Sequence, residues 1–278
     1  MNKKLVIGLG MMISLMIFAG CGEVVEETEA KVSGESYIEE NRLLYITEMD
    51  MNTEMSDSIY INLDEISEKL VIQSGGEYVL SGSTHKTIQI DVHDEIVHLF
   101  LENLTVETAE GPAIGVISAG KVIITLVEGS SNALFDAAYY DDEHVVGAIA
   151  ADCDLTINGA GSLYACGYSK DAIYSKDVIK ILGGTIQLRS KRNGIRGNDG
   201  LVLQPLSLAI ESEKNGCQTV NADKEDKGMI HVLGGEISII AGEYGMSAAS
   251  DLYVKDGTMQ FNSIQGNLYT EGQLFLPE

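Results

Sequence analysis

Short apolar segments alternate with glycine, asparagine and aspartate turns along the chain from about residue 57 to the end. A small residue followed by an apolar one recurs at Ala148-Ile149, Ala172-Ile173, Gly194-Ile195, Gly216-Cys217 and Gly245-Met246, in steps of 24, 22, 22 and 29 residues. A second motif, with alternating apolar positions, recurs in phase at residues 155–157, 179–182, 201–203, 230–233 and 252–254. Such short alternating runs between turn residues predict β-strands.

A repeat of 22–24 residues made of short strands predicts an all-β solenoid, a single-stranded parallel β-helix in which each repeat forms one rung. Equivalent side chains then stack one rung apart, so we expect Ile173, Ile195 and Cys217 to form a column in the core. Asn193 and Asn215 should form an amide ladder at a turn. The competing folds are a β-sandwich and a β-propeller, neither of which explains a register kept over three rungs. Residues 63–70 have the one helical pattern, and we expect them to cap the N-terminal end.

The N-terminus has the pattern of an export signal. Lys3 and Lys4 precede an uncharged apolar stretch at residues 5–18, and Ala19-Gly20 provides small residues for cleavage. Cys21 follows, so this segment resembles the bacterial lipobox, although a plain secretory signal is the alternative. We therefore expect a signal peptide at residues 1–20, a lipidated Cys21 with an acidic tether at 21–56, and the β-helix at 57–278. The protein should be exported and anchored by lipid to the cell membrane, on its extracellular side.

The chain is strongly acidic, with 18 Lys and Arg against 42 Asp and Glu and a net charge of −24. Such a charge repels nucleic acid, which we exclude as a partner. The three cysteines after Cys21 are Cys153, Cys166 and Cys217. Their odd number argues against a disulfide-stapled scaffold, and we expect Cys217 to be a small core residue.

Two consecutive repeats carry a more specific resemblance. Residues 171–177 (DAIYSKD), 181–186 (ILGGTI) and 193–199 (NGIRGND) resemble the repeats of bacterial carbohydrate-binding domain-containing lipoproteins, and the similarity spans about residues 65–260. The resemblance implies a right-handed parallel β-helix like that of pectate lyases, which binds plant cell-wall polysaccharide and calcium. The leading aspartate of the family's turn is kept only at Asp171, so fewer calcium sites are expected here.

Asp171, Asp177, Asp199 and Asp154 are the candidate calcium ligands. Calcium prefers six to eight oxygen ligands, and carboxylates on neighbouring turns can supply several of them. The alternative is that these aspartates only hydrogen-bond to their own turns.

Two further groups are candidates for sugar binding. Residues 136–144 lengthen one repeat and should project as a loop, on which Tyr139 and Tyr140 can stack against sugar rings. Arg189, Lys191, Arg192 and Arg196 form a basic cluster that can bind uronate carboxylates. For both groups the alternative is a solvated surface without a ligand.

We expect a monomeric, non-catalytic protein that binds an acidic pectic or a cellulosic polysaccharide with the assistance of calcium. The first alternative is a calcium-dependent pectate or uronan lyase, in which Lys191, Arg192 or Arg196 would act as the base. The second is a structural or adhesive solenoid without a sugar site. No serine-histidine-aspartate pattern, zinc spacing or phosphate loop appears in the sequence.

Overall fold

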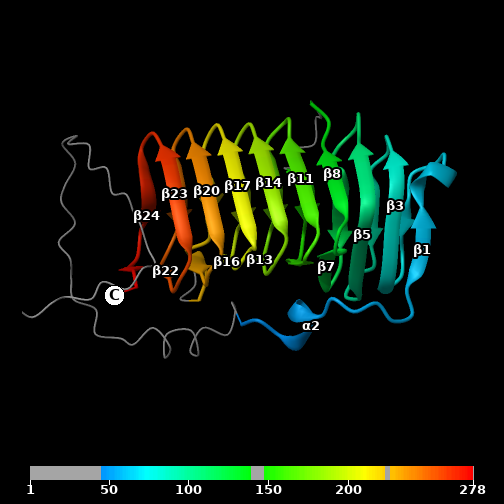
Figure 1. The fold of residues 1–278 in the computed structure, drawn as a ribbon, viewed down its shortest axis with the longest axis horizontal. Coiled ribbons are helices and arrows are strands. Elements are labelled where there is room, and N and C mark those ends of the chain that lie inside the picture. The colour runs from blue at the N-terminus through cyan, green and yellow to red at the C-terminus, as the bar shows by residue number, and fades with distance from the viewer. Residues whose placement is uncertain (1–44, 139–146, 223–225, 278) are drawn as a thin grey trace, which may run out of the picture.

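The computed structural model describes residues 45–138, 147–222 and 226–277, and this part of the chain is almost entirely β-structure (Figure 1). Its helices are a four-residue α-helix, α2 (Glu48–Met51), and a 3-10 turn, η2 (Leu63–Glu65). None of the described helices is long and apolar enough to cross a membrane. The strands pair in parallel in two sheets, an arrangement consistent with the predicted β-helix.

The larger sheet has 16 strands and consists of two strips that meet at a long strand, β5 (Ile96–Glu107). The strands of the first strip lie side by side in Figure 1. They are β8 (Ser131–Phe135), β11 (Ser162–Gly167), β14 (Thr185–Ser190), β17 (Ser207–Ser212), β20 (Glu236–Ala241) and β23 (Thr258–Ser263). The second strip contains β7 (Lys121–Leu126), β10 (Asp154–Gly159), β13 (Val178–Ile181), β16 (Gly200–Leu203), β19 (Met229–Val232), β22 (Leu252–Val254) and β25 (Leu274–Phe275). At the N-terminal end, β5 pairs with β3 (Gly76–Thr84), which pairs with β1 (Ile59–Asn62).

The second sheet has nine strands. They are β2 (Val71–Ile72), β4 (Ile88–Asp91), β6 (Ile114–Ser118), β9 (Gly147–Ala151), β12 (Asp171–Ser175), β15 (Ile195–Gly197), β18 (Cys217–Gln218), β21 (Tyr244–Ala248) and β24 (Gly266–Thr270). Strand order rises steadily along every strip, so each strand pairs with its equivalents in the repeats before and after it.

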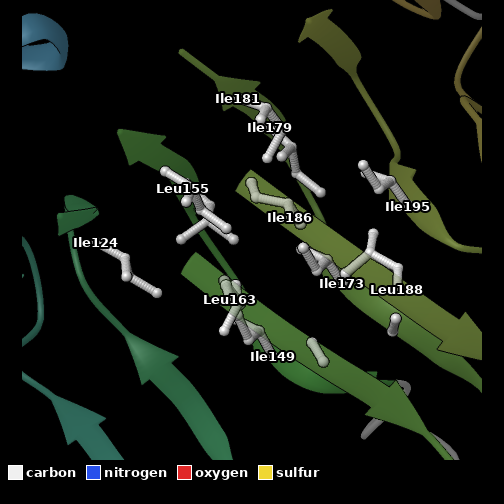
Figure 2. Close-up of a cluster of buried hydrophobic side chains, with 14 of the residues drawn as sticks. Ile124, Ile149, Leu155, Leu163, Ile173, Ile179, Ile181, Ile186, Leu188 and Ile195 are labelled. Atoms are coloured by element: carbon white, nitrogen blue, oxygen red, sulfur yellow. The ribbon is translucent and has the colours of Figure 1, made fainter. Parts of the chain in front are cut away.

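The predicted core column is confirmed. Ile173 pairs with Ile195, and Ile195 pairs with Cys217, and all three side chains are fully buried. Figure 2 shows Ile173 and Ile195 beside Ile186 and Leu188 of the first strip. Each buried side chain of this size contributes about 1.5–3 kcal/mol. The small residue of the repeat has a packing cause, because a Cβ at Gly194 would lie 2.3 Å from Ile210 Cγ2.

The predicted amide ladder is also confirmed and begins one step earlier, at an aspartate. Asn193 Nδ2 donates to Asp171 Oδ1 at 3.0 Å, and Asn215 Nδ2 donates to Asn193 Oδ1 at 3.1 Å. The backbone N–H of Tyr244 then donates to Asn215 Oδ1 at 3.1 Å. Both side-chain steps span 22 residues, so the polar corner keeps the same register as the core.

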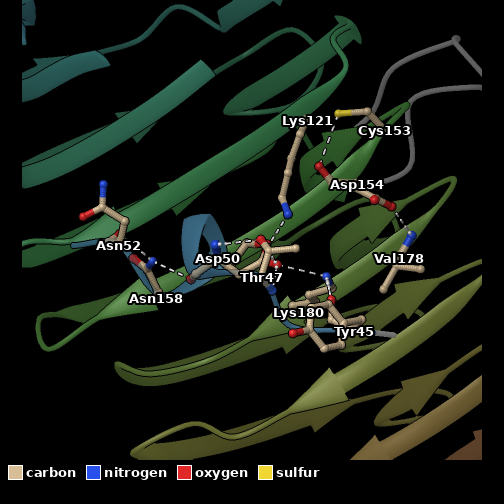
Figure 3. Close-up of polar contacts among 11 residues, drawn as sticks. Tyr45, Thr47, Asp50, Asn52, Lys121, Cys153, Asp154, Asn158, Val178 and Lys180 are labelled. Atoms are coloured by element: carbon tan, nitrogen blue, oxygen red, sulfur yellow. Dashed lines mark hydrogen bonds and ion pairs between the residues drawn. The ribbon is translucent and has the colours of Figure 1, made fainter. Parts of the chain in front are cut away.

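The last part of the tether predicted at residues 21–56 is packed against the β-structure. Residues 45–52, which we call the strap, lie against the second strip (Figure 3), and Asp50 is fully buried there. Its carboxylate forms ion pairs with Lys121 and with Lys180, the latter at 3.1 Å. Residues upstream of the predicted boundary at residue 57 therefore pack on the sheet, because the buried carboxylate of Asp50 finds its counter-charges there.

Hydrogen bonds also hold the strap against the second strip. Thr156 Oγ1 donates to Asp50 Oδ1 at 2.5 Å, and Asn158 Nδ2 donates to the carbonyl oxygens of Asp50 and Asn52, each at 2.9 Å. Burial alone would raise the pKa of Asp50, but hydrogen bonds from Lys121, Thr156 and Thr47 outweigh it and lower the pKa. The carboxylate is thus ionised throughout the neutral range.

The N-terminal helix predicted at residues 63–70 is much shorter in the structure. Only Leu63–Glu65 is helical, as a 3-10 turn whose Leu63 side chain is buried in the core. Asn62 accepts a hydrogen bond from the backbone N–H of Asp64 and so caps this turn. The segment still packs on the core at this end, with Ile61, Ile66 and Leu70 partly buried against it.

Candidate functional site

A groove lies at the carboxyl ends of five first-strip strands, where the chain leaves the strip after β11, β14, β17, β20 and β23. Side chains there are in register, since Cys166 pairs with Arg189, and Arg189 with Glu211. The same column continues through Ile240 to Asn262. Backbone pairing continues round the bend, for example from Lys191 N to Gly167 O at 3.2 Å.

We call this feature the corner groove; its volume is about 590 Å³. Small residues form its floor, namely Gly167, Ser190, Ser212 and Ala241. Two rows of residues flank the floor: Cys166, Arg189, Glu211, Ile240 and Asn262 in one row, and Tyr168, Lys191, Glu213, Gly242 and Ile264 in the other. The groove thus crosses five strands at right angles to their direction.

The two ends of the corner groove are apolar. Tyr168 is 42% exposed and stacks on Phe135, with ring centroids 6.0 Å apart and an interplanar angle of 17°. At the other end Ile264 is 83% exposed, and Ile240 beside it is also exposed. Large apolar side chains left uncovered in a concave surface are typical of ligand sites.

The centre of the corner groove is charged but balanced. It has two cations, Arg189 and Lys191, and two anions, Glu211 and Glu213. Arg189 Nη2 lies 3.8 Å from Glu211 Oε1, and both side chains are mostly exposed. Exposed pairs of this kind contribute less than about 1 kcal/mol. Their donors and acceptors can therefore exchange this contact for a polar ligand at little cost.

Burial determines the ionisation of the neutral groups near the groove. It raises the pKa of the Cys166 thiol and of the Tyr164 and Tyr168 phenols. At neutral pH the thiol is protonated and poorly nucleophilic, and the phenols are neutral. Tyr168 thus presents an uncharged ring with a hydroxyl group.

The predicted basic cluster divides into two parts. Arg189 and Lys191 line the corner groove, whereas Arg192 and Arg196 are held by Asp171. Arg192 donates twice, from Nε to Oδ1 at 2.7 Å and from Nη2 to Oδ2 at 2.5 Å. Arg196 Nε lies 3.1 Å from Asp171 Oδ2, and its guanidinium lies over the Tyr174 ring at 4.5 Å. The chain bends after β14, and this bend separates Arg189 and Lys191 from Arg192 and Arg196, although all four are close in sequence.

The four predicted calcium ligands do not fit one calcium site. Both carboxylate oxygens of Asp171 are used by Arg192 and Arg196, and Asn193 also donates to one of them. Asp171 therefore cannot supply a free carboxylate without breaking a buried ion pair.

The other three predicted ligands lie near one another on the second-strip side. Burial raises the pKa of Asp177, and the carboxylates of Asp154 and Asp199 raise it further. Asp199 forms an ion pair with Lys227, and Asp154 accepts the backbone N–H of Val178 at 3.2 Å. Among the described residues, no group of three or more histidine, cysteine, aspartate or glutamate side chains is arranged to hold a metal ion.

Three predicted residues lie outside the described part of the chain: Tyr139, Tyr140 and Cys21. Conversely, the sequence analysis missed Glu211, Glu213, Ile240 and Ile264 of the corner groove. The sequence gives little sign of these residues, because each points away from the core and lies 22–29 residues from its neighbour in the groove. Only the pairing of the strands brings them together.

Comparison with known proteins defines the family. A family model described as carbohydrate-binding domain-containing protein matches residues 67–273, which include the whole corner groove. The chain belongs to this carbohydrate-binding domain-containing family.

One relative in the family comes from Acetivibrio thermocellus and is described as a carbohydrate-binding domain-containing protein. It is 25% identical over 283 residues, which cover 99% of this chain and 96% of the relative. Among solved structures, a gadolinium derivative of a polysaccharide lyase-like protein from C. thermocellum matches with a TM-score of 0.74 and 24% identity. That match covers 80% of this carbohydrate-binding domain-containing chain and 96% of the other, and it establishes the likeness of the fold.

Proposed function

We propose that this protein binds polysaccharide in the corner groove and does not cleave it. The observation that carries the proposal is the groove itself, which crosses five strands in register, with apolar side chains at both ends and balanced charges at its centre. A sugar chain needs both features, because each ring has apolar C–H faces and a rim of hydroxyl groups that donate and accept hydrogen bonds. The family membership supports the same function.

We propose a neutral, cellulosic glycan in preference to an acidic pectic one. The chain has a net charge of −24, and Glu211 and Glu213 lie in the groove itself. Both repel a polyuronate, while Arg189 and Lys191 only balance these two carboxylates. Calcium assistance stays a prediction, and a chelator tests it directly.

The contacts of the basic residues favour a binding protein over a lyase. A lyase of the expected type needs an arginine or lysine that is free to take a proton. Of the three candidate bases, Arg192 and Arg196 are both bound to Asp171. Lys191 lines the groove, so it is the candidate that an assay for unsaturated uronide products would test.

The remaining predictions form part of the proposal. We propose a right-handed helix of about 22–24 residues per rung, because crossover connections between parallel strands are right-handed in nearly all proteins. We also propose export, lipidation at Cys21 and a monomer that holds the groove outside the cell. Metabolic labelling with a radioactive fatty acid, compared between the natural chain and Cys21→Ser, tests the anchor.

Affinity electrophoresis tests the proposed function. The full-length protein in neutral detergent is run through gels that contain a soluble cellulose derivative, xylan or polygalacturonate, each with calcium and with chelator. We expect retardation by a neutral glycan in both conditions, stronger with calcium than with chelator, and its loss in Tyr168→Ala. Tyr269→Ala is the matched control, because Tyr269 is 40% exposed and also stacks on an aromatic ring, but lies outside the groove. Unretarded migration on every glycan would instead support the structural or adhesive solenoid.

A further inference from the structure

The corner groove has a regular spacing along its length. Each of its five strands contributes one residue to each of the two flanking rows, at equivalent positions, because the strands pair without a register shift from Cys166 to Asn262. Adjacent parallel strands lie about 4.8 Å apart. The groove therefore repeats at this interval over a length of about 20 Å.

This interval is close to the advance per residue of an extended pyranose chain. We propose that the corner groove binds a linear, extended glycan parallel to the solenoid axis, with one sugar residue on each strand and five consecutive subsites. The inference rests on the proposed function and adds to it the conformation, direction and length of the bound chain. A helically coiled glycan changes direction within a few residues and does not match a straight series of equal steps.

The five subsites differ in chemistry. The first, at β11, offers the Tyr168 ring, and the last, at β23, offers the Ile264 side chain. The second and third, at β14 and β17, offer the cations and then the anions, which suit hydroxyl groups as acceptors and donors. The fourth, at β20, has the apolar Ile240 on one side and Gly242 on the other. Gly242 leaves no room for a side chain, because a Cβ there would lie 2.1 Å from Glu213 O.

In the part of the chain that the structure describes, both ends of the groove allow a longer glycan to continue. β23 is the last strand of the first strip, so no described strand lies beyond it on that path. At the other end the apolar surface continues onto Phe135 of β8, which stacks with Tyr168. The site thus suits an internal segment of a polysaccharide, and its affinity should stop rising once all five subsites are filled.

The experiment is a calorimetric titration of the full-length protein with oligosaccharides of increasing length. Cello-oligosaccharides are the extended probes, and malto-oligosaccharides, which coil, are the comparison. We expect Kd to fall several-fold for each residue added up to five and to change less than about twofold beyond that. Malto-oligosaccharides should bind at least about tenfold more weakly at every length.

Variants at the ends locate the subsites. In Ile264→Ala the advantage of the pentamer over the tetramer should disappear, while the tetramer binds as it does to the natural protein. Ile240→Ala should weaken tetramer and pentamer alike, and Tyr269→Ala should leave the whole series unchanged. The proposal is overturned, but the proposed function stands, if polysaccharide is retained and Kd no longer changes beyond two or three residues. Absence of binding to every oligosaccharide and every polysaccharide overturns both.

Discussion

At the scale of single residues, buried ionisable groups on the outer surfaces of the strands distinguish this protein from a plain solenoid. Asp171 is completely buried and forms ion pairs with two arginines whose side chains are 27% and 18% exposed. His231 is buried in the second strip beside the Tyr253 ring, with centroids 5.6 Å apart. Such groups make stability depend on charge and pH at positions that the hydrophobic pattern does not reveal.

Replacing Asp171 by asparagine should lower the free energy of unfolding by about 3 kcal/mol, because Arg192 and Arg196 lose a buried counter-charge. Urea unfolding measures the change. The matched control is Asp152→Asn, which removes an exposed pair with Lys176 and should cost less than about 1 kcal/mol. Equal losses in the two variants would contradict the role given to Asp171.

Acid should destabilise the protein through His231. Burial lowers the pKa of His231 to about 4, whereas in an unfolded chain it is about 6.5. Between these values the unfolded state binds the proton and the folded state does not, so stability falls as the pH falls. From pH 7 to pH 5 this amounts to about 2 kcal/mol.

Urea unfolding at the two pH values checks the prediction. His231→Phe should lose that part of the pH dependence. Val202→Ala, at the paired position on β16, should lower stability without changing the pH dependence. An unchanged pH dependence in His231→Phe would show that another group is responsible.

At the scale of elements, the strap at residues 45–52 packs against the second strip of the solenoid. Asp50 lies 71 residues from Lys121 and 130 residues from Lys180 in sequence, yet it contacts both. Ile46 packs nearby on a cluster that includes Val178 and Val202. The strap therefore combines a small apolar contact with a buried ionic one, and we expect the ionic contact to decide its position.

Asp50→Asn should release the strap, because Lys121 and Lys180 lose their buried partner. We expect amide hydrogen exchange in residues 45–52 to accelerate about 100-fold, in line with the loss of roughly 3 kcal/mol. Glu48→Gln, on the same helix but exposed, is the matched control and should exchange like the natural protein. Unchanged exchange in Asp50→Asn would mean that the apolar contact alone holds the strap.

At the scale of the whole molecule, the acidic charge acts on stability and on binding in different ways. A net charge of −24 repels itself in the folded state. Salt shortens the Debye length from about 30 Å at 0.01 M to about 8 Å at 0.15 M. The corner groove is locally neutral, so a neutral glycan bound there experiences little of this field.

Raising the salt concentration over this range should therefore stabilise the protein by about 1 kcal/mol, or roughly 2–4 °C in Tm. Thermal unfolding followed by circular dichroism measures this shift. Retention on a neutral glycan should stay the same in the same buffers. A fall in Tm with salt would indicate that attractive ion pairs outweigh the net repulsion.

The sequence by itself determined the parts of this structure that repeat. Inward positions such as Ile173, Ile195 and Cys217 recur at the period of the fold, because every repeat must bury its side chains on those of the previous one. The same constraint kept Asn193 and Asn215 in register. Strand type, parallel stacking and the polar corner were therefore predictable from local pattern alone.

Only the tertiary structure decided which outward side chains meet. Arg189 and Arg192 are three residues apart, but the bend after β14 places the first in the corner groove and the second on Asp171. Outward positions are not constrained by the core, so Glu211 or Ile264 leaves no periodic signal. The local partner of Asp50 is Thr47, which explains a helix cap but does not reveal the distant contacts with Lys121 and Lys180. The fold could be predicted from the sequence because burial constrains every repeat in the same way. The groove and the strap could not, because they depend on contacts that do not recur from repeat to repeat.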